Sequence, residues 1–377
     1  MTLQFKSLPF YHKLASVLVS LVVLGYLVIQ GKEILSPLVF SCLFSILLLP
    51  LSAFLEKKFG MRRGLAAVIS VVFLLLVIGT ILYAIALQMG DLADDWPQFK
   101  TQLNSTFLSL RHWVAVNFHI NASKQLNFIK TATNNVLASG TAMVGTTLVS
   151  LTSLLLFLVF TFIYTIFFLT YRGLIMRFLV SVFLEKNEEV VHDIIEQVQQ
   201  ILRKYILGLF IEMGIVSAVV FLVFWALGIK YALLLGLITG LFNIIPYIGI
   251  FTAMLASVLI TFATAAATVK ILMVIGTLVT VHLVDSNILL PVIVGSKVKI
   301  NPLITVLGVV LGEMIWGISG MFLSIPVIAV SKIIFDRIDS LRPWGILLGE
   351  ENKRTRLKFN SRRVASSAET KVSIPPV

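Results

Sequence analysis

Long apolar runs separated by short polar stretches dominate the chain. Eight of them are helix candidates: 14–30, 34–55, 64–88, 146–171, 206–227, 231–262, 269–290 and 303–334. A helix needs about 20 apolar residues to cross a bilayer, and only helices or closed barrels satisfy their backbone polar groups there. The pattern therefore predicts an all-α, polytopic membrane protein with eight apolar segments.

Two segments in the C-terminal half are too long for one span. Segments 231–262 and 303–334 have 32 residues each, whereas a tilted span reaches about 25. NIIPYIG interrupts the first and GEMIWGISG the second. Two arrangements fit: two broken, tilted spans (eight spans in total), or two re-entrant hairpins beside six spans. Lys297 and Lys299 favour the hairpins, because basic loops prefer the cytoplasm; Lys270 favours the broken spans.

Changes in composition divide the chain. We expect N-terminal transmembrane helices (1–89), an extracytoplasmic helical domain (90–145), a fourth span with a cytoplasmic amphipathic helix (146–205), a transport core (206–335) and a basic, largely disordered tail (336–377). The amphipathic helix carries apolar residues at helical spacing from Val190 to Leu202. It is either a simple connector or a helix that lies on the membrane or contacts a neighbouring subunit, and its Glu-rich polar face favours a protein contact over a lipid one.

Charge indicates the orientation. The loop 56–63 has four basic residues against one acidic, and 332–371 has ten against five, so we expect both termini in the cytoplasm. The net charge of +12 lies in short loops and the tail of a chain that is 58% hydrophobic, which predicts a bilayer rather than a nucleic acid as partner. The single cysteine, Cys42, excludes an internal disulfide. We expect no metal and no cofactor.

The helix breaks are the first candidate site. Backbone freed by a break at membrane depth is tolerated only inside protein or beside a hydrated cavity, and transporters bind substrates and ions there. This indicates Asn243, Pro246, Tyr247 and Gly249 as substrate contacts.

Ionisable groups within apolar segments are functional candidates by default. Asp285 and Glu313 are therefore candidates for proton or cation coupling. Glu212 and His282 lie close to the ends of predicted spans, which favours an interfacial position for both.

Enzyme motifs do not fit. The chain has no GxxxxGK[ST] phosphate loop and no HExxH. The stretch GISG (317–320) matches the GxSG of rhomboid proteases, but all five histidines precede Ser319, the reverse of the rhomboid order. We expect a protein that is not an enzyme.

With these motifs placed, the C-terminal half resembles the autoinducer-2 exporter family of bacterial membrane proteins. The stretches YALLLGLITGLFNIIPYIG (231–249) and DSNILLPVIVGSKVKINPLITVLGVVLGEMIWGISGMFLSIP (285–326) carry the likeness. The matching residues are Asn243, Pro246, Tyr247, Gly249, Asn287, Pro291, Pro302, Gly312, Gly317, Gly320 and Pro326. Departures from the family pattern are Ile250, where proline is frequent, and Glu212, where glutamine is common.

The resemblance implies a bacterial inner-membrane protein that exports small molecules, as some members are thought to do, or exchanges sodium for protons. It adds Asn287 and Pro291 to the substrate contacts, Glu212 to the coupling residues, and Gly312, Gly317, Gly320, Pro302 and Pro326 as residues of helix breaks and packing. It also implies a homo-oligomer, with pentamers suggested for relatives. The hypothesis is a secondary-active exporter of a small molecule such as autoinducer-2 or another polar metabolite, working by alternating access around the two broken segments. The alternatives are a cation–proton antiporter and a non-transporting membrane scaffold.

Overall fold

The computed structural model describes residues 10–95, 97, 101, 105, 153–182, 188–245, 248–265, 268–293 and 300–350. Regular structure in these residues is helical, apart from one isolated bridge between Ile300 and Gly349. Six of the described helices are long and apolar enough to cross a membrane by length and composition: Lys32–Phe59, Arg63–Asp94, Ser153–Thr170, Glu189–Ala226, Val269–Ile293 and Ile318–Arg337. Shorter apolar helices accompany them. The prediction of an all-α, polytopic membrane protein is confirmed.

The chain divides into two compact units. The first comprises Met1–Leu184 and Leu202–Gly295, and the second comprises Glu185–Ile201 and Ser296–Val377. Most of the predicted extracytoplasmic domain (90–145) and the tail after Glu350 lie outside the described residues.

The N-terminal part of the first unit contains α1 (Phe10–Gln30), α2 (Lys32–Phe59), α3 (Arg63–Asp94), the helix Ser153–Thr170 and α6 (Arg172–Val182). One apolar core joins α2, α3 and Ser153–Thr170, and its buried members are Leu48, Ala67, Val71, Leu74, Phe162 and Leu169. Most large apolar side chains of α1 are exposed, as expected of a helix that contacts lipid.

The polar loop between α2 and α3 begins at Gly60, whose φ of 63° suits glycine. One turn before it, Glu56 accepts two hydrogen bonds from Arg172, at 3.0 Å from Nη1 and 2.7 Å from Nη2. This two-point ion pair ties the end of α2 to the start of α6, because the planar guanidinium matches both carboxylate oxygens.

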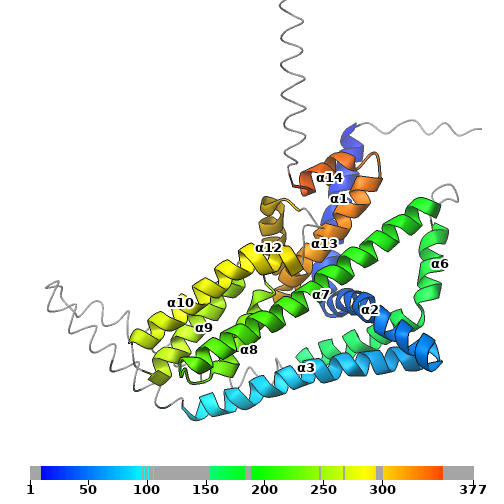
Figure 1. Ribbon diagram of the computed structural model, residues 1–377. Helices are drawn as coiled ribbons and strands as arrows, with labels where there is room; N and C mark the ends of the chain where they lie inside the picture. The colour runs from blue at the N-terminus through cyan, green and yellow to red at the C-terminus, as the bar shows by residue number, and fades with distance from the viewer. Residues whose placement is uncertain are drawn as a thin grey trace, which may run out of the picture. The chain divides into compact units, whose positions relative to one another are not determined.

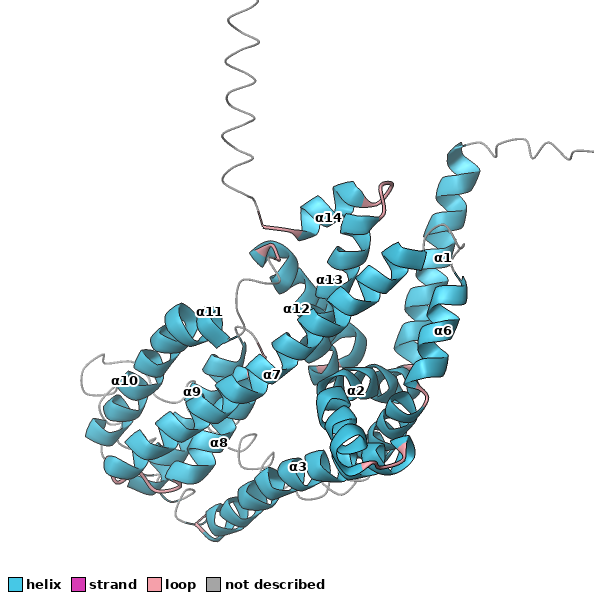
Figure 2. Ribbon diagram, turned by 45° about the vertical axis from the view of Figure 1, so that its right-hand side comes forward, coloured by secondary structure: helices cyan, strands magenta, loops and turns pink. Residues whose placement is uncertain are grey.

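The remaining helices of the first unit are the later part of α7 (Glu188–Ala226), α8 (Ala232–Asn243), α9 (Ile248–Ala265), α10 (Thr268–Val284), the π-helix η2 (Asp285–Leu289) and α11 (Leu290–Ile293). Helices α8, α9 and α10 lie side by side (Figures 1 and 2). Their shared core with α7 is Val216, Val220, Phe224, Ile229, Ala232, Leu235, Val274 and Leu278.

Helix α7 differs from the sequence-based expectation. The predicted amphipathic helix ending at 205 and the predicted span beginning at 206 are one uninterrupted helix of 39 residues. No proline or glycine lies between Glu188 and Leu207, so the change from an amphipathic to a uniformly apolar pattern occurs without a break.

Both overlong segments are broken where the sequence predicts. In the first segment, α8 ends at Asn243 and α9 begins at Ile248. The two helices pack against each other. Gly249, near the start of α9, lies so close to the Phe242 carbonyl that a Cβ would overlap it.

The second break forms a hairpin in the second unit. Helix α12 (Pro302–Trp316) turns at Gly317, with φ 66° and ψ −141°, into α13 (Ile318–Arg337). A Cβ on Gly312 would overlap the Gly320 backbone, and the reverse holds. Farther from the turn, Gly308 faces Ile328, so the two helices run antiparallel in close contact.

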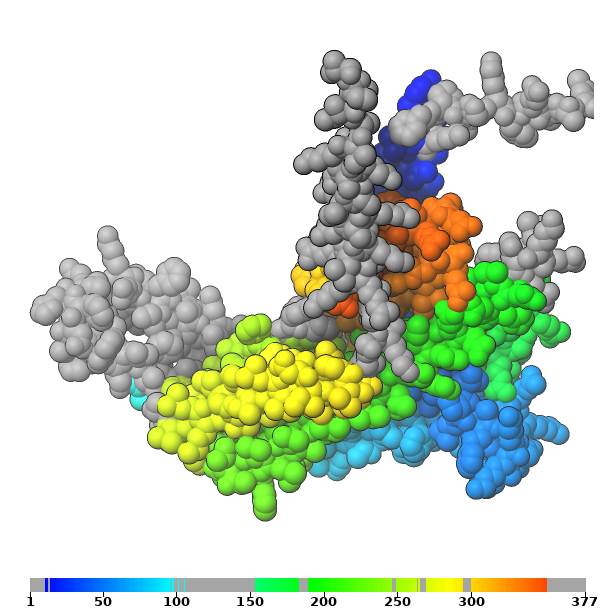
Figure 3. All heavy atoms as spheres, turned by 45° about the horizontal axis from the view of Figure 1, so that its top comes forward, coloured from blue at the N-terminus to red at the C-terminus, as the bar shows by residue number. Residues whose placement is uncertain are grey.

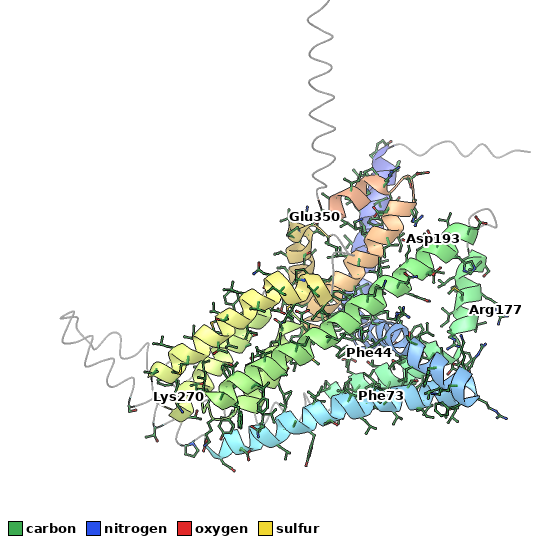
Figure 4. All side chains as sticks on the ribbon, in the orientation of Figure 1. Phe44, Phe73, Arg177, Asp193, Lys270 and Glu350 are labelled. Atoms are coloured by element: carbon green, nitrogen blue, oxygen red, sulfur yellow. The ribbon has the colours of Figure 1, made fainter. Side chains whose placement is uncertain are left out.

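The ends of this hairpin are fixed by caps and charge pairs. Asn301 caps α12 by accepting a hydrogen bond of 2.9 Å from the Leu303 amide, with Pro302 as first helical residue. Pro326 lies buried inside α13. Helix α14 (Arg342–Leu348) follows. Arg337 pairs at 2.5 Å with Asp193 (labelled in Figure 4), so the amphipathic start of α7 contacts the end of α13.

A polar cluster, here called the α3–α8 clasp, joins the end of α3 to the start of α8. Asp95 forms an ion pair with Lys230, and the Tyr231 hydroxyl lies 2.6 Å from Asp95 Oδ2 and 2.9 Å from the Asp91 carbonyl oxygen. Tyr231 adopts φ 62°, a left-handed conformation that costs a non-glycine residue about 1–2 kcal/mol. The polar contacts of the clasp therefore converge on a residue with a strained backbone.

The stabilising contribution of the α3–α8 clasp depends on pH. Hydrogen bonds from Lys230 and Tyr231 lower the pKa of Asp95 below its usual 3.8, and the hydrogen bond to Asp95 raises the pKa of Lys230 above 10.5. The Asp95 contribution is complete above 3.8 and is lost as the pH falls through the lowered pKa. The Lys230 contribution is complete below 10.5 and is lost as the pH rises through the raised pKa.

Asp95→Asn should therefore lower the thermal midpoint of the detergent-solubilised protein at pH 7, and the difference from wild type should shrink under acid.

Tyr231→Gly should be more stable than Tyr231→Ala by about 1 kcal/mol, because both lose the hydroxyl but only glycine relieves the positive φ. Equal stability of the two Tyr231 variants would contradict the strained conformation.

The α12–α13 contact predicts that Gly320→Ala destabilises the protein by about 1–3 kcal/mol, because its Cβ must push the Gly312 backbone away. The matched control is Gly214→Ala in α7, where a Cβ meets nothing within 4 Å and helix propensity favours alanine. Denaturation in detergent measures both. Wild-type stability of Gly320→Ala would show that the two glycines are not in contact.

Candidate functional site

Three polar side chains meet inside the first unit, and we call them the carboxyl cluster: Glu212 from α7, Asn243 from the end of α8 and Asp285 from η2. The Asn243 amide nitrogen donates to Glu212 Oε1 and to Asp285 Oδ2, both at 3.0 Å. Glu212 is only 3% exposed and Asp285 only 5%. One neutral amide therefore bridges two buried carboxyl groups.

Glycines bring α8 close enough to α7 for this bridge. Gly236 and Gly240 form a GxxxG pattern, and a Cβ on either would overlap α7, at Ser217 and Phe221 for the first and at Ser217 and Met213 for the second. Small residues at this spacing allow helix backbones to approach closely in membranes. Asn243 follows Gly240 by one turn, beside Glu212.

Helix ends and irregularities position the other side chains. Asn243 is the last residue of α8, one turn after Gly240, where α8 lies closest to α7. Asp285 begins the π-helix, an irregularity frequent at functional sites because it displaces side chains from the α-helical register.

Two carboxyl oxygens of the cluster remain without a hydrogen-bond partner among the described residues, namely Glu212 Oε2 and Asp285 Oδ1. Both atoms are closed off from solvent. An unpaired buried carboxylate is costly, and the Asn243 amide carries no charge to offset it. The arrangement is suited to taking up a proton or a cation between the two carboxyls.

Further titratable groups lie near the cluster. Tyr205 is buried on α7, two turns before Glu212. His282 precedes Asp285 by one turn, with Nε2 3.5 Å from the Ser286 hydroxyl and a buried Nδ1 lacking a hydrogen-bond partner in the described part of the chain. Among the described residues, no group of three or more His, Cys, Asp and Glu side chains is placed to hold a metal ion.

The structure thus brings together three of the residues that the sequence indicates. Glu212 lies well inside α7 and is buried rather than at the start of a span, because α7 begins at Glu188 instead of near 206. Asn243 contacts both carboxyls instead of facing an open site. The close-packing glycines Gly236 and Gly240 are not among the predicted site residues, although the GxxxG pattern of GLITG (236–240) is visible in the sequence.

The remaining predicted site residues lie elsewhere or outside the described chain. Pro246 and Tyr247 are not among the described residues. Asn287 is exposed and donates to the Leu283 carbonyl at 2.7 Å, and Pro291 is exposed in α11. Glu313 belongs to the second unit, where its side chain is exposed.

The bridge predicts that Asn243→Leu destabilises the protein by about 1–3 kcal/mol, because the buried carboxyls lose their donor. Combining it with Glu212→Gln should cost less than the sum of the two single changes, since a glutamine amide can donate to Asp285. Denaturation of the four proteins in detergent forms the double-mutant cycle. Strict additivity would show that Asn243 and Glu212 do not interact.

Comparison with known proteins accords with this architecture. "Putative transport protein YrrI" of Bacillus subtilis (strain 168) is 28% identical over 311 residues, covering 80% of this chain and 86% of the relative. "Putative transport protein YhhT" of Escherichia coli (strain K12) is 24% identical over 348 residues, covering 90% of this chain and 95% of the relative. "Putative permease PerM" of the same strain is 26% identical over 151 residues, covering 40% and 43%.

The family resemblance seen in the motifs is confirmed across most of the chain. Residues 18–340 match the AI-2E family transporter family, a range that includes every residue of the carboxyl cluster and both helix breaks. The chain is a multi-pass membrane protein that belongs to the AI-2E transporter family.

Proposed function

We propose that the protein is a secondary-active exporter of a small molecule, coupled to proton movement at the carboxyl cluster. The observation that carries this proposal is the burial of Glu212 and Asp285 with a single neutral donor between them. The family match and the transport names of the relatives support a transport role.

The first step of the proposal concerns charge. Ionising both carboxyls in a buried site places two negative charges together without a compensating partner, which is strongly unfavourable. A proton shared by the pair removes one of these charges. Proton uptake and release are therefore tied to whether the cluster is closed off or open to water.

The second step concerns movement. Asn243 ends a half-helix, and half-helix ends at breaks are where secondary transporters bind substrates and ions. When α8 moves relative to α7, the amide leaves the carboxyls and the pair meets water or cargo. In this mechanism the Asn243 amide is bonded to both carboxyls only in the closed state, while Glu212 and Asp285 carry the proton.

One observation favours a second function, cation–proton antiport. Glu212 Oε2 and Asp285 Oδ1 are oxygen ligands left without a hydrogen-bond partner in the described chain, and hard cations prefer oxygen ligands. A sodium ion there would replace the shared proton. Rotation of the Asn243 amide would then present its oxygen to the ion.

We extend the proposal to the cell by analogy with the family: a bacterial inner membrane, cytoplasmic termini and a homo-oligomer such as a pentamer. The cargo class proposed is a small polar metabolite or an autoinducer-2-like signal. Glu313 remains a proposed second proton site, to be tested separately.

Proteoliposomes that contain a pH-sensitive dye test the coupling. Glu212→Gln and Asp285→Asn should each slow protein-dependent proton movement about tenfold, because either change removes a proton-carrying oxygen from the pair. The control is Glu33→Gln, an exposed carboxyl in the first turn of α2. Glu313→Gln is measured in parallel.

The same assay separates the two functions. Proton movement that appears only after sodium is added identifies the antiporter. Wild-type proton movement in both Glu212→Gln and Asp285→Asn would contradict a coupling role for the cluster. Comparison of metabolites released by cells expressing wild type or Asp285→Asn then identifies the cargo.

A further inference from the structure

An apolar crevice of about 440 Å³ lies between α7 and α10. Val216, Val219 and Val223 form its α7 wall, and residues of α10 and η2 between Gly276 and Leu289 form the other. Its volume falls within the roughly 300–1,000 Å³ range typical of small-molecule sites. Helix α10, in yellow, lies at the surface on the face shown in Figure 3.

The crevice continues the two helix faces that carry the carboxyl cluster. On α7, Val216 lies one turn after Glu212, and both side chains are buried. On the other wall, the lining residues Val281 and Leu289 lie four residues before and after Asp285. Residues four apart share the face of an α-helix, so Val216 on α7 and Val281 on α10 place this end of the crevice on the helix faces that carry Glu212 and Asp285.

The walls of the crevice are almost entirely apolar and carry no charge. Apart from Thr277 and Thr280 the lining is apolar or glycine, and the Thr280 hydroxyl already donates to the Gly276 carbonyl at 2.8 Å. None of the lining residues carries a charge. An occupant is therefore held by apolar contact along its body, and a countercharge for the cluster has to come from the occupant itself.

We infer that the crevice binds a protonated primary amine with an apolar body, whose ammonium group is directed to Glu212 and Asp285. Two adjacent carboxyls complement a cation, whereas a lipid acyl chain or a neutral molecule leaves them without a countercharge. This inference rests on the proposed function and names its substrate class: an amine cation that competes with the proton for the cluster.

The ammonium reaches the carboxyl oxygens when Asn243 withdraws. Both unpartnered oxygens are closed off from solvent in this structure. Because Asn243 is the terminal residue of α8, its amide can move aside without unwinding the helix. Three N–H groups of an ammonium then replace the two N–H groups of the amide.

The test uses the full-length protein in lipid nanodiscs and radiolabelled 4-phenylbutylamine, with empty nanodiscs as reference. This amine is protonated at pH 7, as a lysine amine is. The neutral probe 4-phenylbutan-1-ol has a comparable body without the charge. We expect saturable binding of the amine and at least about tenfold weaker binding of the alcohol.

Gly276→Leu fills the crevice. A Cβ on Gly276 meets nothing within 4 Å, so the first carbon of the larger side chain has room, and Gly276 lines the crevice. It should weaken amine binding about tenfold or more. The matched control is Gly214→Leu on α7, also unobstructed and absent from the crevice lining, which should bind the amine as wild type does.

Equal binding of amine and alcohol, or undiminished amine binding by Gly276→Leu, would overturn the inference and leave the crevice as a lipid contact. A change in oligomeric state of Gly276→Leu without a change in amine binding would also overturn it, and would assign the crevice to a second copy of the chain. Amine binding in a wild type that moves no protons contradicts the proposed coupling alone. Proton movement without amine binding contradicts this inference alone.

Discussion

The burial of two carboxyl groups against one neutral amide is the constraint on which the rest of the site depends. Glu212, Asn243 and Asp285 come from three helices of the first unit, and their contacts hold only while those helices keep their positions. The polar groups gain little net stability from one another in an apolar interior. Under the proposed function, this arrangement changes state when a charge enters or leaves.

Helix α8 lies between the carboxyl cluster and a second polar cluster, the α3–α8 clasp. Its 12 residues span about 18 Å at 1.5 Å per residue, less than the roughly 30 Å thickness of a bilayer core. The α3–α8 clasp precedes its first residue and Asn243 is its last. GxxxG contacts with α7 lie between them. Both ends of this short helix are therefore held by polar contacts with other helices.

Much of the fold follows from the sequence because the membrane makes the rules strict. Apolar run lengths predict the helices, and the two overlong segments break within NIIPYIG, after Asn243, and within GEMIWGISG, at Gly317 with its positive φ. The continuity of α7 escapes such reasoning, because hydropathy changes at 206 while the backbone does not. A change of composition does not end a helix.

The site was predictable in its members but not in its contacts. Asp285 and Asn243 are polar residues in apolar segments and attract notice for that reason. Their pairing with Glu212 depends on how closely α8 approaches α7 and on the extra residue of the π-helix at 285–289. Both are properties of helices in three dimensions, and a single sequence states neither.

The bridging amide has a consequence for observation. Both N–H bonds of the Asn243 side chain are engaged with carboxyl oxygens in the closed cluster, so exchange of these hydrogens with deuterium requires the bridge to open. The side-chain amide of Asn243 therefore reports on the opening of the cluster through its own hydrogen-exchange rate. The exchange rate of that one amide counts how often the carboxyl pair is released, whichever molecule the protein carries.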